Sequence, residues 1–427
     1  MIIFSRDRFL TAAYHWLPLC WMLLAGTQAL GMLRVLGINI GGQVDSATAG
    51  SPVERSLFLL MLILGIYLLS LRRHILPATL RANAPLIVLF TYIAISISWS
   101  PLPEVSLKRY IKMVGALTMA LLIATENNPA KALHSLLSRY LWIVLTGSLF
   151  TILLVPEIGK VVNYDGSISN AGICFGKNGL GQCALAATLM ATIPIIDKGR
   201  AGLTTSNGSM LLLAVLILII AHSATSLMVT MIVVALLLLI RMFSILTPIH
   251  AGGIALYTVI LLGATFALAE NLTTNFSIAE YVIESLGKDA TLTGRTELWN
   301  DVWKLASERP VLGHGTGSFW VGEVGVSRPI LETYYWPPNQ AHNGYLDVIA
   351  ELGFVGLALV LIVAAYGIYN AFKLLPHDHQ YAMLKIALIS SVLLLNMTES
   401  SFCRITHRVW LYMLLAVTIP PPPQSKP

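Results

Sequence analysis

The sequence predicts an all-α polytopic membrane protein of about twelve transmembrane helices, with one large polar loop that contains short helices. Two observations carry this prediction. Hydrophobic residues make up 56% of the 427 residues and charged residues only 11%, whereas a soluble domain carries roughly 25% charged residues. The apolar residues also form long runs between short polar segments, and a helix needs about 20 apolar residues to cross a bilayer.

The apolar runs give the order of the expected spans. The first run lacks a small-residue cleavage site, so we expect a membrane span there and no cleaved signal peptide. The stretch 209–243 is too long for one helix, and we divide it at the polar segment 222–226. The expected spans are 12–31, 56–71, 84–99, 110–125, 136–155, 178–196, 209–222, 225–243, 251–269, 345–370, 381–397 and 402–419.

These runs divide the chain into three parts. Residues 1–269 are expected to form an N-terminal membrane bundle of about nine spans, and residues 345–427 about three spans with a Pro-rich tail. Residues 270–344 form the polar loop between them. If the N-terminus is cytoplasmic, the short cytoplasmic segments hold more lysines and arginines than those on the other side. This distribution favours a loop on the periplasmic face.

The same topology places the unusual polar segments on one face of the membrane. We therefore expect the functional site on the outer face. These segments are 99–101, 175–178, 222–226, the long loop and 399–402.

The polar loop contains its own secondary-structure signals. Residues 294–309 have the pattern of an amphipathic helix, in which Leu298, Val302 and Leu305 share one face. Thr293 is a suitable N-cap, and Pro310 is a stop signal. After a turn rich in glycine over 313–317, which we interpret as a flexible hinge, a new helix is expected to begin near Asn343 and run into the membrane.

His342 is the first candidate for chemistry. It precedes an asparagine that can cap a helix and a glycine that lets a substrate approach closely. Histidine has an unperturbed pKa near 6.5 and is the usual general base at neutral pH. A structural alternative is an interfacial histidine that bonds to a loop carbonyl.

Four cations are expected on the same face as His342. Arg295 opens the loop helix, Lys177 begins a helix where free N–H groups favour an anion, and Arg404 and Arg408 lie one turn apart. Each taken alone could extend to lipid headgroups or pair with an acidic side chain. Together with the histidine they fit a diphosphate held without a metal ion.

Other kinds of site have weaker support. The sequence contains no Asp-x-Asp pair, and His377-Asp378-His379 is interpreted as a solvated polar turn. The four cysteines, Cys20, Cys174, Cys183 and Cys403, show no metal-ligand spacing and are interpreted as helix-packing residues, with a Cys174–Cys403 bridge as the less favoured alternative. The glycines at 313–317 lack the strand-turn-helix context of a nucleotide loop. No basic-aromatic stripe indicates nucleic acid.

An ordered set of motifs resembles the O-antigen ligase and polymerase superfamily of bacterial membrane glycosyltransferases. The motifs extend over most of the chain. They are Trp99-Ser100-Pro101, Phe175-Gly176-Lys177-Asn178-Gly179-Leu180-Gly181, Gly294-Arg295-Thr296-Glu297-Leu298-Trp299, Arg309-Pro310-Val311-Leu312-Gly313-His314-Gly315, Ala341-His342-Asn343-Gly344-Tyr345-Leu346-Asp347 and Glu351-Leu352-Gly353.

The resemblance implies a multi-pass enzyme of the bacterial inner membrane that works on the periplasmic face. Such enzymes take a glycan from undecaprenyl diphosphate and pass it to an acceptor hydroxyl on another lipid-linked glycan or on lipid A–core. It implies no nucleotide sugar, metal or other cofactor, and partners among membrane lipids and other polysaccharide-assembly proteins. By resemblance, His342 is the base and Arg295 holds the diphosphate.

One departure from the family pattern favours a polymerase. O-antigen ligases usually have an arginine after the serine of the middle polar segment, whereas this chain has Ser223-Ala224-Thr225-Ser226. The segments at 99–101 and 315–320 are also more similar to exopolysaccharide polymerases. A ligase and a protein O-oligosaccharyltransferase use the same chemistry and stay open. A polysaccharide-precursor transporter or flippase is the alternative from another class, although the spans hold few ionisable residues.

Overall fold

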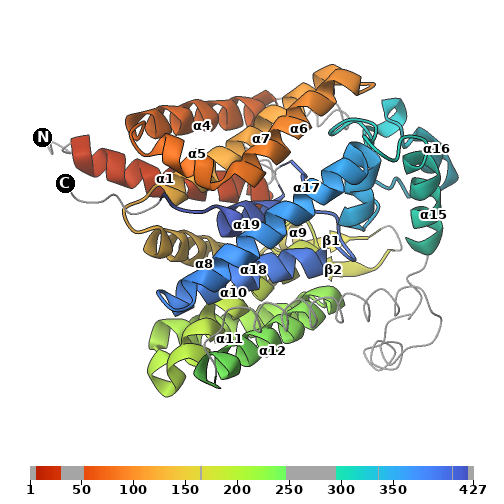
Figure 1. The fold of residues 1–427 in the computed structure, drawn as a ribbon. Coiled ribbons are helices and arrows are strands. Elements are labelled where there is room, and N and C mark those ends of the chain that lie inside the picture. Colours follow the sequence, from red (N-terminus) through yellow and green to blue (C-terminus); the bar gives the residue numbers. More distant parts are fainter. Residues whose placement is uncertain are drawn as a thin grey trace, which may run out of the picture.

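The computed structural model describes residues 6–29, 52–163, 166–246, 295–334, 336–405 and 407–421. These residues form a helical bundle with one small antiparallel hairpin, which confirms the predicted all-α class (Figure 1). The expected span at 251–269, the first part of the polar loop and the Thr293 cap lie outside the described residues.

The helices before the polar loop follow the predicted runs. In the first half they are α1 (Arg6–Gly26), α4 (Pro52–Leu71), α5 (Leu76–Ala82), α6 (Ala84–Ser96), η1 (Ile97–Trp99), α7 (Pro103–Ala124), α8 (Pro129–Leu154) and α9 (Pro156–Gly159). After the hairpin of β1 (Lys160–Val162) and β2 (Ile168–Asn170) come α10 (Lys177–Lys198), η2 (Gly199–Gly202), α11 (Thr205–Ile220) and α12 (Ala224–Leu246). The expected division into two helices at 222–226 is confirmed, because α11 ends at Ile220 and α12 begins at Ala224.

The remaining elements are α15 (Arg295–Ala306), η3 (Gly322–Val324), α16 (Arg328–Thr333), α17 (Gly344–Leu374), α18 (His379–Leu395) and α19 (Arg408–Val417). The expected loop helix and the helix start at Asn343 are confirmed. The expected span at 402–419 is wrong at its start, because α19 begins only at Arg408. The residues before it are folded back against the end of α18, where Phe402 N–H donates to Asn396 Oδ1 (3.1 Å).

Several helices are suited to crossing a membrane. Among the described residues, five helices are long and apolar enough, or up to six if α5 and α6, bent by 85°, count as one span. The expected number of about twelve therefore stays a prediction. α11, α18 and α19 are too short for this criterion, with 16, 17 and 10 residues. α7 carries several charged residues near its start.

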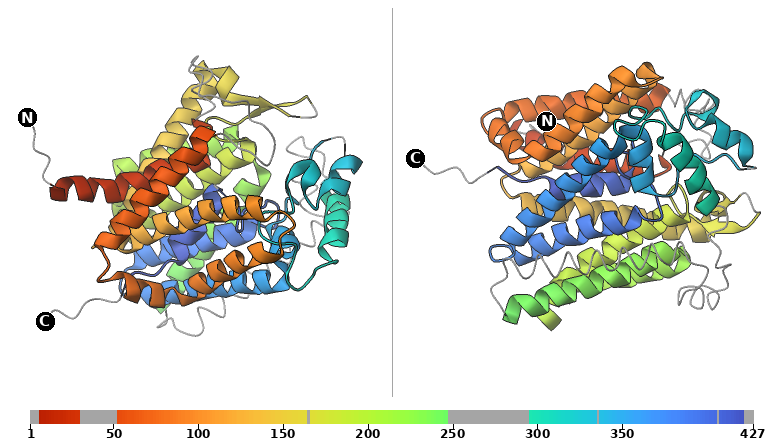
Figure 2. Two further views of the ribbon diagram at one scale, coloured as in Figure 1. Left: turned by 90° about the horizontal axis from the view of Figure 1, so that it is seen from above. Right: turned by 45° about the vertical axis from the view of Figure 1, so that its right-hand side comes forward.

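α10 lies at the centre of the bundle. In its most apolar stretch 72% of the residues are buried. In the corresponding stretch of α4 only 28% are buried, and α4 exposes leucine and isoleucine side chains over most of its length. α10 packs against α8, α11, α12 and α18. The views in Figures 1 and 2 show α11 and α12 on one side of it and α4 to α7 on the other. The N-terminus of α10 is thereby held in the middle of one end of the bundle.

α15, α16 and the hairpin gather at this same end (Figure 1). α15 buries Leu298, Val302 and Ala306 in a small apolar cluster with Phe319 and Ile330. The predicted apolar face of the loop helix is confirmed for Leu298 and Val302, while Leu305 packs at the edge of the cluster. The cluster attaches the loop to the first turns of α17.

The glycine-rich turn at 313–317 is packed against a break in α17, and the flexible hinge expected there stays a prediction. Gly353 has φ 66° inside α17 and interrupts the helix. The N–H groups of His314 and Gly315 donate to the carbonyls of Ala350 (3.0 Å) and Glu351 (2.8 Å). Beyond the break, the N–H groups of Phe354 and Val355 donate to Pro310 (2.8 Å) and Val311 (3.2 Å). The turn thus satisfies the backbone groups that the break leaves without helical partners.

We predict that Gly353→Ala destabilises the protein. A Cβ at this position would lie 2.2 Å from Val311 O, and the positive φ disfavours any L side chain. The expected loss is about 1–3 kcal/mol, typical of overpacking, seen as a lower midpoint of thermal unfolding in detergent. Gly208→Ala in α11 is the matched control, because its Cβ would meet only Leu203 Cδ1 at 3.5 Å. Equal midpoints for the two variants would contradict this account.

Candidate active site

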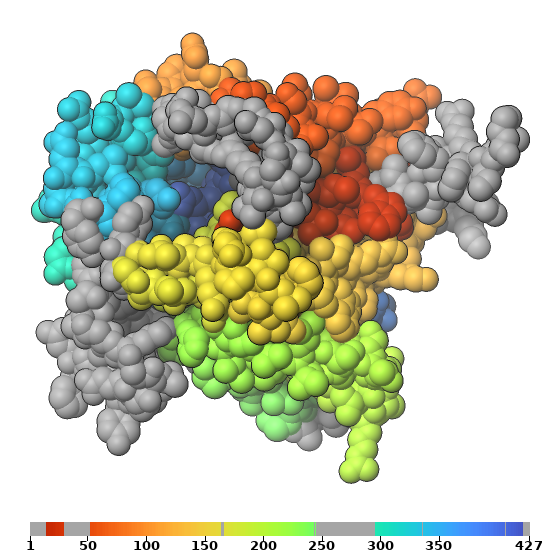
Figure 3. Space-filling view, turned by 180° about the vertical axis from the view of Figure 1, so that it is seen from behind, coloured from red at the N-terminus to blue at the C-terminus, as the bar shows by residue number. Residues whose placement is uncertain are grey.

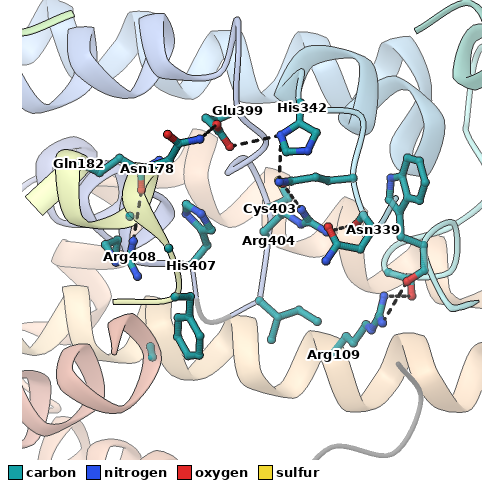
Figure 4. A pocket seen from close by; sticks show the side chains of 18 of the residues that line it. Arg109, Asn178, Gln182, Asn339, His342, Glu399, Cys403, Arg404, His407 and Arg408 are labelled. Atoms are coloured by element: carbon teal, nitrogen blue, oxygen red, sulfur yellow. Dashed lines mark hydrogen bonds and ion pairs between the residues drawn. The ribbon is translucent and has the colours of Figure 1, made fainter. Parts of the chain in front are cut away.

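A cavity of about 670 Å³ opens at the end of the bundle that carries α15 and the hairpin. Figure 3 shows the C-terminal segment at the bottom of a hollow between segments coloured yellow and cyan. The walls come from α7, the start of α10, the turn after residue 315 and the polar segment before α19. The charged and imidazole residues that line the cavity are Arg109, Lys177, His342, Glu351, Glu399, Arg404, His407 and Arg408. Figure 4 shows how Arg109, His342, Glu399, Arg404, His407 and Arg408 lie around it.

The backbone around His342 is held from both sides. His342 has φ 51°, a left-handed conformation that is uncommon for a residue other than glycine. Before it, Ala341 N–H donates to Asp347 Oδ1 (3.0 Å), and Ala341 O accepts from Trp299 Nε1 (2.8 Å). After it, Asn343 N–H donates to Ser400 Oγ (3.1 Å). The imidazole is therefore fixed at the start of α17 and faces the cavity.

Asn343 also starts α17, as the sequence predicts. Its Oδ1 accepts hydrogen bonds from the N–H groups of Tyr345 (3.1 Å) and Leu346 (3.2 Å). Gly344 N–H donates to Asn396 O (2.8 Å), and a Cβ on Gly344 would lie 1.9 Å from Asn396 Oδ1. Only glycine fits here, because α17 begins directly against the turn that follows α18.

A carboxylate lies beside the imidazole. Glu399 Oε2 is 3.5 Å from His342 Nδ1, and the two side chains are 10% and 24% exposed. The other carboxylate oxygen, Oε1, accepts a hydrogen bond from Asn178 Nδ2 in the first turn of α10. Gln340 Nε2 also lies 3.2 Å from His342 Nδ1. Glu399 can orient the imidazole and stabilise its protonated form.

Arg404 lies next to His342 and is held by neutral groups. Its guanidinium donates to Gln340 Oε1 and to Asn339 O (2.6 Å). Because Gln340 contacts both Arg404 and His342, the cation and the imidazole are positioned as one unit. No carboxylate neutralises Arg404 among the ion pairs of the described residues.

Arg408 and Lys177 line the cavity on the α10 side. The buried Arg408 guanidinium donates twice to Gly26 O (3.1 and 2.6 Å) and once to Gln182 Oε1 (3.4 Å). Gly179 makes room for it, since a Cβ there would lie 2.2 Å from Arg408 Nη1. Lys177 is the first residue of α10, where the helix N-terminus adds partial positive charge. This part of the cavity suits an anion.

Arg295, the remaining cation predicted for this site, is not among the residues that line the cavity. Its Nη1 donates to Thr398 O (3.0 Å), directly before Glu399. Thr398 Oγ1 in turn donates to Thr225 Oγ1 (3.2 Å). Arg295 thus joins α15 to the segment that carries Glu399. The residue that it contacts directly precedes Glu399, the partner of His342.

Sequence reasoning missed Arg109, Glu351 and Glu399 as site residues. Arg109 on α7 donates to Gly317 O (2.7 Å) and Trp320 O (3.3 Å), and Glu351 Oε2 accepts from Gly317 N–H (2.8 Å). The polar segment at 399–402 was a usable signal for Glu399.

The electrostatics of His407 differ from those of the arginines. Burial, and then repulsion from Arg408 and Arg404, hold the pKa of the His407 side chain well below its ordinary value. Its Nδ1 accepts a hydrogen bond from Val409 N–H (3.3 Å) and caps α19. His407 is therefore neutral at neutral pH. The lysine and arginine side chains that line the cavity are Arg109, Lys177, Arg404 and Arg408.

Outside the cavity, Asp301 on α15 pairs with Lys304 (2.7 Å) and accepts from Tyr334 Oη (3.1 Å). The hydrogen bond from Lys304 is the main cause that lowers the pKa of Asp301, and burial raises the pKa of Tyr334 to about 12. These contacts fasten α15 to the residue after α16. Asp301 is thus engaged by other residues of the loop and does not pair with the cations of the cavity.

The other sites considered from sequence have structural roles in the described part of the chain. Asp378 Oδ1 accepts from Tyr381 N–H (3.1 Å) and caps α18, and His379 Nδ1 lies 3.0 Å from Asp197 Oδ1. No group of three or more metal-binding side chains occurs among the described residues. The four cysteines are free thiols, so the Cys174–Cys403 bridge is not formed.

Comparison with known proteins bears on what this cavity does. A protein-family model described as O-antigen ligase matches residues 209–361. A curated relative, the exopolysaccharide production protein ExoQ of Rhizobium meliloti (strain 1021), is 30% identical over 103 residues. That alignment covers 23% of this chain and 24% of the relative, so the chain matches about a quarter of the relative's length.

The two comparisons support a resemblance of this chain to the O-antigen ligase and polymerase superfamily, carried by residues 209–361. The resemblance seen in the motifs is thereby confirmed. Members of the family are glycosyltransferase-like enzymes, and the family indicates glycosyl transfer at a membrane in polysaccharide assembly. The matched region contains Arg295 and His342. Lys177, Glu399, Arg404 and Arg408 lie outside it, and the fold brings all four of these to the cavity that His342 lines.

Proposed function

We propose that this protein is a bacterial inner-membrane glycosyltransferase that polymerises an exopolysaccharide or O-antigen. It moves a glycan from undecaprenyl diphosphate to an acceptor hydroxyl on another lipid-linked glycan, at the periplasmic face. One observation carries the proposal. A single cavity holds an imidazole with a carboxylate partner and, beside them, Lys177, Arg404 and Arg408, none of which is in an ion pair among the described residues.

The cations account for the donor. The diphosphate binds between Lys177, Arg404 and Arg408, with the prenyl chain between apolar helices. As the bond from the anomeric carbon to the phosphate oxygen breaks, its electron pair goes to the leaving diphosphate. Fixed cations stabilise this growing charge more in the transition state than in the ground state, which is what accelerates a reaction.

The imidazole accounts for the acceptor. The acceptor oxygen attacks the anomeric carbon from the face opposite the diphosphate, so the configuration inverts. In the tautomer whose Nδ1 proton lies toward Glu399, Nδ1 accepts no hydrogen bond from Gln340 Nε2, and the other ring nitrogen of His342, Nε2, is free to take the acceptor proton. Glu399 then stabilises the imidazolium, and Asn178 holds Glu399 in place. The diphosphate leaving group drives the transfer, and no nucleotide sugar, cofactor or metal is invoked.

A ligase is the second candidate, favoured by the family description. The same residues would pass the glycan to lipid A–core. The middle polar segment bears on this choice: Ser223 Oγ donates to Asn178 Oδ1 (3.3 Å), and Ser223 and Ser226 pack against Gly181. Because the residue after Ser223 is alanine, this chain lacks the extra arginine of typical ligases beside the Asn178–Glu399 contact.

His342→Ala tests the base. Removing a general base should lower kcat by about 10²–10⁴-fold, and the affinity for undecaprenyl diphosphate should stay unchanged because the cations remain. The measurement is glycan transfer by purified protein in detergent, with thermal unfolding as the folding control. Transfer at the normal rate by folded His342→Ala protein would show that the base assignment is wrong.

Arg404→Gln and Arg295→Ala separate the two kinds of arginine. Arg404→Gln should weaken binding of undecaprenyl diphosphate by about tenfold or more, because it removes a charge-assisted contact. Arg295→Ala should lower kcat and leave that affinity unchanged, because Arg295 contacts Thr398 O and not the cavity. Equilibrium binding and transfer rates give both values. Equal losses of affinity in the two variants would show that Arg295 also binds the diphosphate.

Deletion of the gene separates polymerase from ligase. For the polymerase we expect loss of high-molecular-weight secreted polymer or long chains, with single repeats still attached to their normal acceptors. Chromatography of extracellular polysaccharide and of lipopolysaccharide provides the measurement. Complete absence of glycan from lipid A–core, with polymer still assembled on the lipid carrier, would instead identify a ligase.

A further inference from the structure

The cavity has two chemically different ends. Arg408 and Gln182 lie on one side of Arg404, and Arg109 lies on the other (Figure 4). The proposed diphosphate site occupies the side of Arg408 and Lys177 and extends to Arg404. The Arg109 end forms part of the same cavity but takes no part in the proposed binding of the diphosphate.

The Arg109 end is poorly suited to a second anion. Two nitrogens of the Arg109 guanidinium are directed at carbonyl oxygens of the turn, those of Gly317 (2.7 Å) and Trp320 (3.3 Å). Glu351 contacts the same residue from the other side, where its Oε2 accepts from Gly317 N–H (2.8 Å). A carboxylate that lines the cavity at this point repels phosphate.

The same groups suit a sugar ring. A carboxylate oxygen accepts more than one hydrogen bond, so Glu351 keeps capacity beyond the Gly317 contact. Trp320 lines this end too, with its Nε1–H already given to Asp347 Oδ1 (2.8 Å), so what it offers the cavity is apolar ring surface. Thr316 adds a lining side chain with a hydroxyl.

We propose that the Arg109 end is a sugar-binding subsite in which Glu351 accepts hydrogen bonds from the hydroxyl groups of a pyranose ring that lies against Trp320. This inference rests on the proposed function. The ring comes either from the donor, next to its diphosphate, or from the acceptor. Arg404 and His342 lie between this subsite and the Arg408 end, so the anomeric carbon of a sugar bridging the two ends is brought to the base.

Glu351→Gln tests the subsite, because the amide oxygen can still accept from Gly317 N–H while the charge is lost. The probes are undecaprenyl diphosphate and the lipid-linked oligosaccharide purified from the producing strain after deletion of the gene. If the ring belongs to the donor, Glu351→Gln should raise the Kd of the oligosaccharide-bearing lipid by about tenfold, as expected for a hydrogen bond to a charged group. The Kd of undecaprenyl diphosphate should not change.

Three further variants make the result specific. Arg404→Gln should raise the Kd of both lipids. Glu323→Gln is the matched control, because Glu323 is exposed in η3 outside the cavity, and it should change neither value. Thr316→Val alters a neighbouring hydroxyl without touching the Gly317 contact. For a donor ring it should raise only the Kd of the oligosaccharide-bearing lipid, by a smaller factor.

A third probe identifies the source of the sugar. It is the free oligosaccharide released from the lipid by mild acid, added together with undecaprenyl diphosphate. Weaker binding of this probe to Glu351→Gln, with the lipid-linked oligosaccharide unaffected, supports an acceptor ring at the subsite. If Glu351→Gln changes none of the three affinities, or weakens all of them equally, the subsite is overturned and the proposed function stands. If wild-type protein binds neither lipid, both are overturned.

Discussion

The turn from Asn396 to Ser401 is the contact on which the site depends. Asn396 Oδ1 accepts from the N–H groups of Ser401 (2.8 Å) and Phe402 (3.1 Å), and its carbonyl accepts from Gly344 N–H (2.8 Å). A helix that stops inside a membrane protein leaves polar backbone groups that lipid cannot satisfy. Asn396 satisfies these groups from within the chain. In doing so it fixes the end of α18, the start of α17 and the position of Glu399 together.

A second break, at Gly353 in α17, is satisfied in the same way by the turn at 310–315. The first part of α17, which begins after His342 and contains Glu351, therefore lies between the turn after α18 and the break at Gly353. Of the two carboxylates that line the cavity, Glu351 lies in this interrupted helix and Glu399 in the turn that follows α18. Within a membrane, non-helical backbone is tolerated only where it is buried in protein or lines a water-filled cavity. The broken helices therefore need the polar cavity or other protein around them, and the segments at the breaks in turn form part of the cavity wall.

The sequence predicted what depends on local pattern. The apolar runs marked the helices, and Asn343 and Gly344 marked the start of α17. It could not show that Gly344 faces Asn396, or that Gly179 faces Arg408, because those requirements come from contacts between distant segments. Arg295 illustrates the limit. Its motif and charge suggested a phosphate ligand, and only the fold directs its guanidinium to Thr398 O.

The way the arginines are held explains how the cavity keeps its charge. The carbonyl and amide oxygens of Asn339, Gln340 and Gly26 orient Arg404 and Arg408 without neutralising them. The carboxylate of Glu399, by contrast, is engaged by Asn178 and His342. Neutral partners fix a cation in advance and leave its field available to a ligand, which is the arrangement that favours a charge developing during reaction. Pairing the same arginines with carboxylates would have given equal rigidity with little attraction for a diphosphate.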